Sequence, residues 1–216
     1  MWRVTGVTMS FNVALTSVLS GASVSQLRYW RQTELLVPEV NSAGRPILYS
    51  FRDILALRAV VKLHQQQSLQ RIRKAFATLP HLDLTEHPAQ YALVAEGPTI
   101  ALVREDGTEI DLVDKPGHAI LVTLVDIMNP FDTQRGEVVD LRRPRPHLQV
   151  REQWLGGWPT IEGTRVPYDA VAELLSDGSI APSEVADYYP DVTAAAARDA
   201  LDFARSVPGW NESTAA

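Results

Sequence analysis

The chain has 216 residues, of which 45% are apolar, enough for one large packed domain or two to three small ones and too many for disorder throughout. It contains no cysteine, which excludes disulfides, thiolate nucleophiles, and zinc or iron–sulfur sites built on thiolates. Its longest strictly apolar runs, such as residues 119–122, are far shorter than the roughly 18 residues that span a bilayer. We therefore expect a cytoplasmic protein without a transmembrane helix.

Charge is distributed unevenly along the chain. Residues 1–80 carry ten Lys and Arg against three Asp and Glu, a net charge of +7, whereas residues 81–146 carry −6 and residues 147–216 carry −7. A basic region followed by acidic ones favours a polyanionic partner at one end only, although segregated charge also occurs on plain solvated surfaces. We expect these three ranges to be three domains.

Residues 1–80 have the element order of a winged helix-turn-helix. Apolar spacing predicts a first helix over residues 12–20, which Gly21 ends with a turn, and Ser23 is placed to cap a second helix. The tight loop 41–46 and the β-prone run that follows it predict a hairpin wing. Two further helices are predicted to begin after Ser50 and Ser68, the last ending before Pro80.

The second helix has the character of a DNA-recognition helix. Its inner face is apolar, while its outer surfaces carry guanidinium, phenol and amide groups that can reach phosphates or base edges in a major groove. An arginine also falls near the tip of the predicted wing, and another opens the third helix. The residues expected to bind DNA are Ser23, Gln26, Arg28, Tyr29, Arg31, Arg45 and Arg52.

This region resembles the DNA-binding domain of MerR-family regulators, through the run Gly21-Ala-Ser-Val-Ser-Gln-Leu-Arg-Tyr-Trp-Arg31 and the later Glu34-Leu-Leu-Val-Pro38 and Tyr49-Ser-Phe-Arg-Asp-Ile54. The resemblance covers about 65 residues. It implies that Arg28, Tyr29 and Arg45 grip the DNA backbone. The usual Gly-Tyr-Arg of the family's wing is replaced here by Gly-Arg-Pro, and the family's long dimerisation helix is missing after Pro80.

The middle region, residues 81–146, is predicted to be a small antiparallel β-sheet. Four β-prone runs at residues 91–95, 99–104, 108–113 and 119–125 are separated by Gly- and Pro-containing turns, a pattern that favours a meander. The sheet could bind an effector or form a dimer interface, and the runs 99–104 and 119–125 are the expected contact between two copies. An extended basic linker is expected over residues 142–146.

Neither a catalytic nor a metal site is expected. No nucleophile–base pair or phosphate-binding loop is present, so we predict that the chain is not an enzyme and uses no cofactor. His81, Asp83, Glu86 and His87 carry ligand-type side chains, but prolines bracket them and no thiolate supports them, which favours an exposed linker.

Residues 147–216 are predicted to contain an extended segment followed by three helices, which begin near Tyr168, Pro182 and Thr193. Their arrangement is expected to resemble a second helix-turn-helix. Its charge of −7 argues against DNA as its partner and favours a protein. The predicted fold class is therefore α+β: an N-terminal winged helix-turn-helix, a small antiparallel sheet, and a three-helix C-terminal domain.

This block resembles domain of unknown function family 433 (DUF433), whose mark is matched by Gly157, Pro159, Ile161 and the run Gly163-Thr-Arg-Val-Pro167, followed by Asp187-Tyr-Tyr-Pro190. The resemblance implies a VapB-type antitoxin that neutralises a PIN-like ribonuclease toxin. Joined to the first resemblance, it implies an autorepressor that also binds its own operator DNA as a homodimer or as a hetero-oligomer with the toxin.

The candidate toxin-binding residues are Arg165, Tyr188 and Trp210. A guanidinium at residue 165 can pair with nuclease carboxylates, although a structural role in tying down helix termini is an equal alternative. The C-terminal tail is expected to be too irregular to pack alone and to offer a Trp as an interface anchor. The alternative function is a one-component MerR-like regulator that senses a small molecule.

Overall fold

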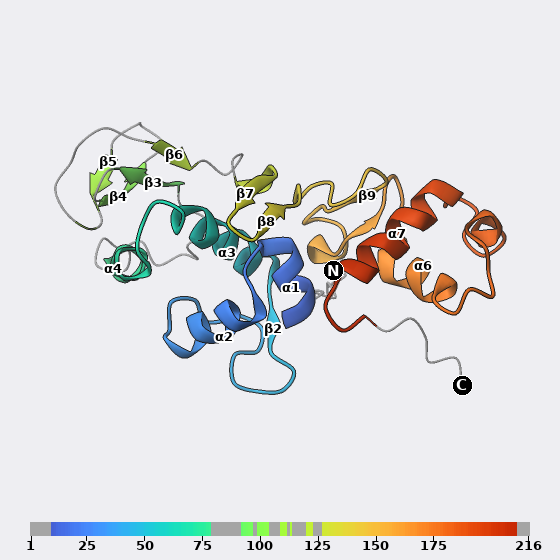
Figure 1. Cartoon of the computed structure of the whole chain (residues 1–216), viewed down its shortest axis with the longest axis horizontal. Helices are drawn as coiled ribbons and strands as arrows, with labels where there is room; N and C mark the ends of the chain where they lie inside the picture. The colour runs from blue at the N-terminus through green and yellow to red at the C-terminus, as the bar shows by residue number, and fades with distance from the viewer. Residues whose placement is uncertain are drawn as a thin grey trace, which may run out of the picture.

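The computed structural model describes residues 10–78, 92–96, 99–103, 109–111, 113, 120–122 and 127–210. Its fold is α+β, as predicted, with helices and small antiparallel sheets (Figure 1). The α-helices are α1 (Val13–Ser20), α2 (Val24–Gln32), α3 (Phe51–Leu63), α4 (Leu69–Thr78), α6 (Tyr168–Leu175) and α7 (Ala194–Ser206), with 3-10 helices η3 (Leu155–Gly157) and η4 (Pro182–Asp187). The strands are β1 (Phe11–Asn12), β2 (Leu48–Tyr49), β3 (Ala92–Glu96), β4 (Thr99–Val103), β5 (Glu109–Asp111), β6 (Ile120–Val122), β7 (Phe131–Thr133), β8 (Gly136–Val138), β9 (Leu148–Gln149) and β10 (Thr160–Ile161).

Side-chain caps set the start of the helix-turn-helix, and the sequence predicts the stop at Gly21 and the cap at Ser23. Asn12 accepts a hydrogen bond from the Leu15 backbone N–H at 2.9 Å, and Gly21 ends α1 in the left-handed region with φ +78°. Ser23 and Gln26 then form a capping box, in which each side chain accepts a hydrogen bond from the other residue's backbone N–H. Leu27 and Trp30 of α2 are buried against the core.

The wing differs from the predicted hairpin. Strand β2 pairs antiparallel with β1, with Phe11 opposite Tyr49, while a single bridge between Asn41 and Leu48 closes the wing loop. The Asn41 side chain holds the loop from inside by donating to the Pro46 carbonyl at 2.7 Å and accepting from the Gly44 N–H at 2.9 Å. Leu48 is thus bridged to Asn41 on one edge and to Asn12 on the other, so the hairpin is reduced to one bridge and the chain before α1 adds a strand on the opposite edge of β2.

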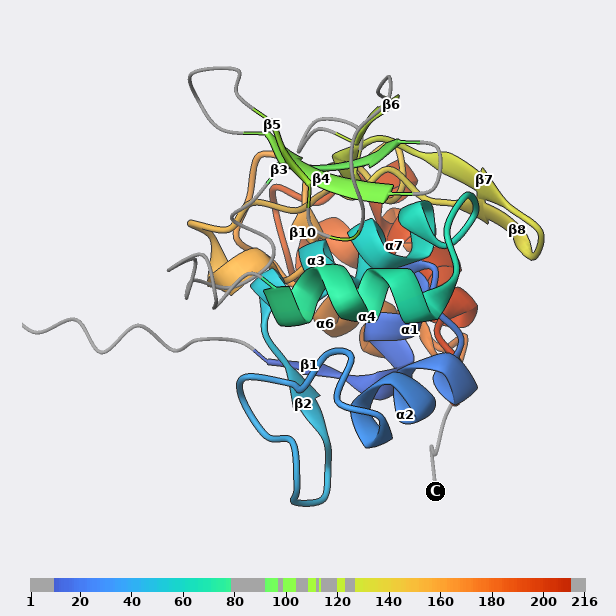
Figure 2. The same ribbon diagram turned by 90° about the vertical axis from the view of Figure 1, so that its left-hand side faces the viewer.

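A four-stranded sheet in the order β5-β4-β3-β6 packs beside α3 and α4 (Figure 2). Ile100 of β4 is completely buried. The predicted meander is wrong in one connection: β6 pairs with β3, with Leu93 opposite Val122, and not with β5. Strand β5 has the sequence Glu-Ile-Asp, and such charged residues suit the edge of a sheet, where no further strand is paired.

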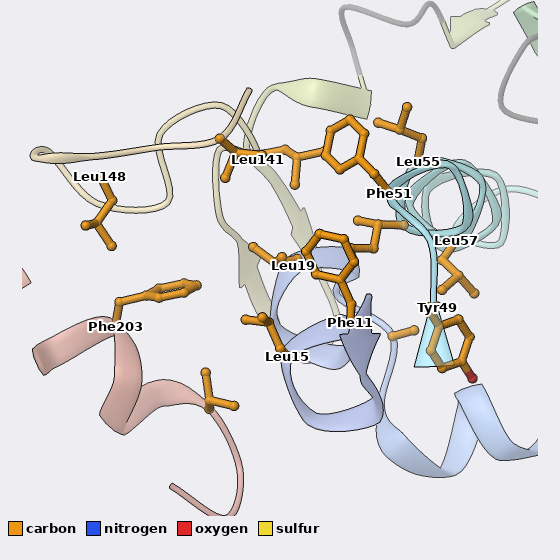
Figure 3. Packing of buried hydrophobic residues seen from close by; sticks show 14 of the residues in the cluster. Phe11, Leu15, Leu19, Tyr49, Phe51, Leu55, Leu57, Leu141, Leu148 and Phe203 are labelled. Carbon is orange, nitrogen blue, oxygen red and sulfur yellow. The ribbon is translucent and has the colours of Figure 1, made fainter. Parts of the chain in front are cut away.

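The C-terminal helices share one core with the helix-turn-helix. Rings follow one another across the molecule: Phe11 lies 6.5 Å from Phe51 and 5.4 Å from Trp158, measured between centroids, and Tyr168 lies 6.3 Å from Trp158 and 4.9 Å from Phe203. Figure 3 shows β1 and α1 residues between those of α3 and Phe203 of α7. The packing therefore crosses the boundaries expected at residues 80 and 146. That these boundaries separate independently folding domains remains a prediction.

Gly157 marks the closest approach of the two parts. It has φ +85°, and a Cβ atom on it would lie 2.4 Å from the Phe51 ring of α3. Real Cβ atoms do not come so close to a ring, so glycine lets the backbone of η3 lie directly on α3.

Arg58 of α3 joins the middle region to the helix-turn-helix from within the core. Its side chain is completely buried, and its guanidinium donates to the carbonyls of Leu19 at 2.6 Å, Asn129 at 2.8 Å and Val139 at 3.0 Å, and also to that of Ile127. Burial lowers the pKa of Arg58 to about 10, against the influence of Asp140, so the group is charged at neutral pH. One of the ten basic residues counted above is therefore unavailable to a DNA partner.

Within the described ranges, no helix combines the length and the apolar character that crossing a membrane requires.

Candidate nucleic-acid interface

The solvent side of α2 carries the groups that the sequence assigns to DNA. Arg28 and Tyr29 are exposed in the middle of the helix, and the Tyr29 side chain keeps 49% of its accessible surface. Leu27 and Trp30 hold the opposite side of the helix in the core. A phenol and a guanidinium exposed side by side on one helix can reach phosphate oxygens or base edges in a major groove.

A hollow of about 600 Å³ separates α2 from the wing loop. Arginines from both elements line it, so guanidinium groups converge from two sides on a concave surface where a polyanion fits. The lining residues are Val13, Val24, Arg28, Arg31, Gln32, Arg45, Ile47 and Tyr49.

Arg31 also holds the wing in place. Its Nη1 donates to the Ser42 carbonyl at 2.9 Å, which fixes the wing loop relative to α2. Tyr49 forms the floor of the hollow; burial raises its pKa, while the nearby Arg31 charge has a smaller, lowering effect. The spacing between helix and wing is thus built into the fold.

Ser23 and Gln26 lie at the start of α2 with their side chains already engaged. Gln26 Oε1 accepts from the Ser23 N–H at 2.8 Å and from Arg135 Nη1 at 3.0 Å, and Ser23 Oγ accepts from the Gln26 N–H at 3.0 Å. Their visible role is to orient α2, and direct DNA contact by either remains a prediction. Arg52 is exposed in the first turn of α3 and does not line the hollow.

Arg135 is a cation at this surface that the sequence did not indicate. Arg135 lies in the turn between β7 and β8, far from the helix-turn-helix in sequence, yet it touches Gln26. Only its charge and its place in a turn were visible in the sequence, and neither feature points to α2.

The three candidate toxin-binding residues lie in different surroundings. The exposed Arg165 guanidinium stands 5.8 Å from the ring centre of Trp154, which Arg151 also approaches at 4.7 Å. Tyr188 follows η4 with 57% of its surface exposed. Trp210 is partly buried and packs against the shared core, and its indole N–H is buried without an acceptor among the described residues. The tail as far as Trp210 therefore packs on the shared core, and toxin binding by Trp210 stays a prediction.

No group of three or more His, Cys, Asp or Glu able to hold a metal occurs in the part of the chain that the structure describes. The ligand-type cluster His81, Asp83, Glu86 and His87 lies outside the described residues.

Two family models match the chain, one before the four-stranded sheet in the sequence and one after it. Residues 13–79 match the MerR HTH family of regulatory proteins, and residues 149–204 match the protein of unknown function DUF433. The chain joins a MerR-family helix-turn-helix domain to a DUF433 domain. In this chain the residues of the two matches meet at Gly157 and Phe51.

Curated relatives match part of the chain. The uncharacterized HTH-type transcriptional regulators Rv1830 of Mycobacterium tuberculosis (strain H37Rv) and Mb1861 of Mycobacterium bovis are each 37% identical over 86 residues. The match covers 38% of this chain and 38% of each relative, so well under half of either protein is compared.

The fold also resembles a solved structure over most of its length. The X-ray crystal structure of Rv2018 from Mycobacterium tuberculosis matches with a TM-score of 0.53 and 15% sequence identity, covering 89% of this chain and 96% of that one. At this identity the likeness concerns the arrangement of the elements alone.

Proposed function

We propose that this chain is a transcriptional regulator that places α2 in the major groove of duplex DNA and grips the backbone with its wing. The observation that carries the proposal is the hollow lined by Arg28, Arg31 and Arg45. A B-DNA major groove is about 12 Å wide and admits one α-helix, with phosphates along both rims. The names of the relatives as HTH-type transcriptional regulators agree with this function.

Replacing Arg28 and Arg45 together by Ala is expected to weaken DNA binding and to flatten its salt dependence. Each lost phosphate contact lowers the slope of log K against log salt by about 0.9, so the double variant is expected to lose about 1.8. Fluorescence anisotropy on a labelled duplex in a series of KCl concentrations measures this slope. Arg198→Ala, an exposed arginine on α7, is the matched control. An unchanged slope in the double variant would show that another surface binds DNA.

We further propose, as the finer function, an antitoxin whose DUF433 domain neutralises a PIN-like ribonuclease toxin. A surface that holds RNA is basic, and the charge of −7 on residues 147–216 gives the complementary potential that speeds capture. Tyr188 is exposed, and so are Glu184, Asp187 and Asp191 at neighbouring positions of the sequence. An exposed aromatic side chain in an acidic stretch of chain is suited to anchor such a contact.

The Tyr188→Ala variant tests the antitoxin function. If Tyr188 anchors the contact, its truncation is expected to weaken capture of a PIN-like ribonuclease encoded by a neighbouring gene by roughly 30-fold, or about 2 kcal/mol. Pull-down and rescue of cells that express the nuclease measure the effect, and Arg165→Ala tests the competing candidate. Glu173→Ala, on the exposed side of α6, is the control. Failure of the unmodified chain to bind that nuclease would rule out the antitoxin function and leave DNA binding intact.

One observation favours the second candidate, a regulator that senses a small molecule. A hollow of about 550 Å³ lies between the start of α2 and the β7–β8 hairpin, with the polar side chains of Gln26, His64, Gln65 and Arg135 in its lining. A polar ligand of this volume would lie against the recognition helix.

We propose in either case that the chain acts as a homodimer, because helix-turn-helix proteins commonly read paired half-sites. Residues 99–104 and 119–125 are the proposed interface.

A further inference from the structure

The turn of the β7–β8 hairpin carries a guanidinium to the first turn of the recognition helix. Arg135 Nη1 donates to Gln26 Oε1 at 3.0 Å, although the two residues are 109 positions apart. Arg135 is exposed, so most of its five N–H donors are available to a further acceptor. Figure 2 shows the hairpin projecting from the side of the molecule on which α1 ends and α2 begins.

The hairpin is held firmly against the helix-turn-helix. Val138 packs so closely on Gly21 that a Cβ atom there would lie 2.4 Å from its side chain. The buried Arg58 binds the carbonyls on both sides of the hairpin, at Asn129 and Val139, and its guanidinium lies 5.1 Å from the centre of the Phe131 ring. Arg135 is therefore presented from a fixed position.

Helical geometry places Arg135 across α2 from the wing. Successive residues are turned by about 100° around a helix axis, so Ser25 and Tyr29 lie in the middle of the exposed face, with Arg28 toward one edge. Arg28 and Arg31 border the hollow beside the wing. Gln26 falls on the opposite edge, and the Arg135 guanidinium is bonded to it. Basic groups thus stand on both sides of the recognition helix.

A role in stabilising the fold explains this position poorly. The first turn of a helix is its positive end, so a cation there is unfavourable unless an anion joins it. Ser23 already completes the cap through Gln26 without Arg135. Asp132 and Glu137, the acids of the described hairpin, form no ion pair with Arg135, although Asp132 lines the same hollow.

We propose that Arg135 is a DNA-contacting residue, which binds a backbone phosphate on the rim of the major groove opposite the rim held by the wing. The β7–β8 hairpin then acts as a second clamp, contributed by the region between the two family domains. This inference rests on the proposed insertion of α2 into the groove, whose two rims are formed by different strands.

Arg135→Gln in the full-length chain tests the proposal, because a Gln side chain stays polar and keeps the aliphatic stem but carries no charge. With a fluorescent random-sequence duplex of about 30 base pairs in KCl from about 50 to about 200 mM, the slope is expected to fall by about 0.9. The difference in affinity between the unmodified chain and the variant then changes by about 3.5-fold across this range. Arg135→Lys, which keeps the charge, is expected to keep the slope.

The controls separate failure of this inference from failure of the proposed function. If Arg135→Gln keeps the slope while the Arg28 and Arg45 double variant loses it, Arg135 does not contact DNA and the proposed function stands. If neither variant changes the slope, the proposed surface itself is wrong. If Arg135→Lys loses as much slope as Arg135→Gln, the effect is structural and the inference is overturned. Arg198→Ala should match the unmodified chain throughout.

Discussion

Arg58→Met is expected to lower the free energy of unfolding by about 4 kcal/mol. Methionine matches the stem of the arginine side chain in length but lacks the guanidinium and donates no hydrogen bond. The carbonyls of Leu19, Ile127, Asn129 and Val139 would then be left without the donor that binds them in the core. Each buried acceptor without a donor costs about 1 to 3 kcal/mol, and relaxation of the surrounding chain reduces the total.

Urea unfolding followed by far-UV circular dichroism measures this loss. Arg52→Met is the matched control, because Arg52 lies in the same helix and is exposed, so its replacement should stay within about 0.5 kcal/mol. Arg58→Lys should fall between the two, since an ammonium keeps the charge but offers three donors instead of five. Equal midpoints for Arg58→Met and Arg52→Met would contradict the role given to Arg58.

Gly157→Ala is expected to destabilise the chain by about 3 kcal/mol, through two separate effects. An alanine at φ +85° is strained by about 1 to 2 kcal/mol. Its methyl group would also meet the Phe51 ring at 2.4 Å, and overpacking of this kind adds about 1 to 3 kcal/mol. The second effect is the one that reports on contact between the MerR and DUF433 domains.

Gly163→Ala separates the two effects. Gly163 has φ +75°, but a Cβ atom on it would meet nothing within 4 Å, so this variant carries the backbone strain alone. The excess loss in Gly157→Ala is expected to be reduced when Phe51→Leu is added, because the smaller side chain gives room to the methyl group. Equal unfolding free energies for the two glycine variants would show that η3 does not rest on α3.

Local features of the chain were predictable and distant ones were not. The caps at Ser23 and Ser50 and the stop at Gly21 act within four residues, so the starts and ends of the first helices follow from short spacings. The arginines beside the wing hollow were found in the same way. By contrast, nothing near Arg58 in sequence distinguishes a buried arginine from a surface one, because the carbonyls it binds lie up to 81 residues away.

Strand pairing and the junction of the domains show the same limit. Regular turns favoured a meander, yet the partner of β6 is decided by which edge is open once β3 and β4 have paired, and this is a property of the whole sheet. Gly157 was recognised as part of a family motif, while its need to be glycine depends on a phenyl ring that is 106 positions earlier. Arg135 was overlooked for the same reason, since its neighbour Gln26 belongs to another region.

The contact between Phe11 and Trp158 bears on how the protein is made. These rings are 147 residues apart, so the ribosome must deliver most of the chain before the core beneath the recognition helix can close. Contacts of such long sequence separation form slowly, since a large loop has to be closed before they stabilise anything. The nascent MerR segment therefore emerges with Phe11 and Phe51 lacking their partners from the later chain. We therefore expect the proposed DNA binding to reach full strength only after translation has passed the DUF433 region, so a prematurely terminated chain should bind DNA weakly.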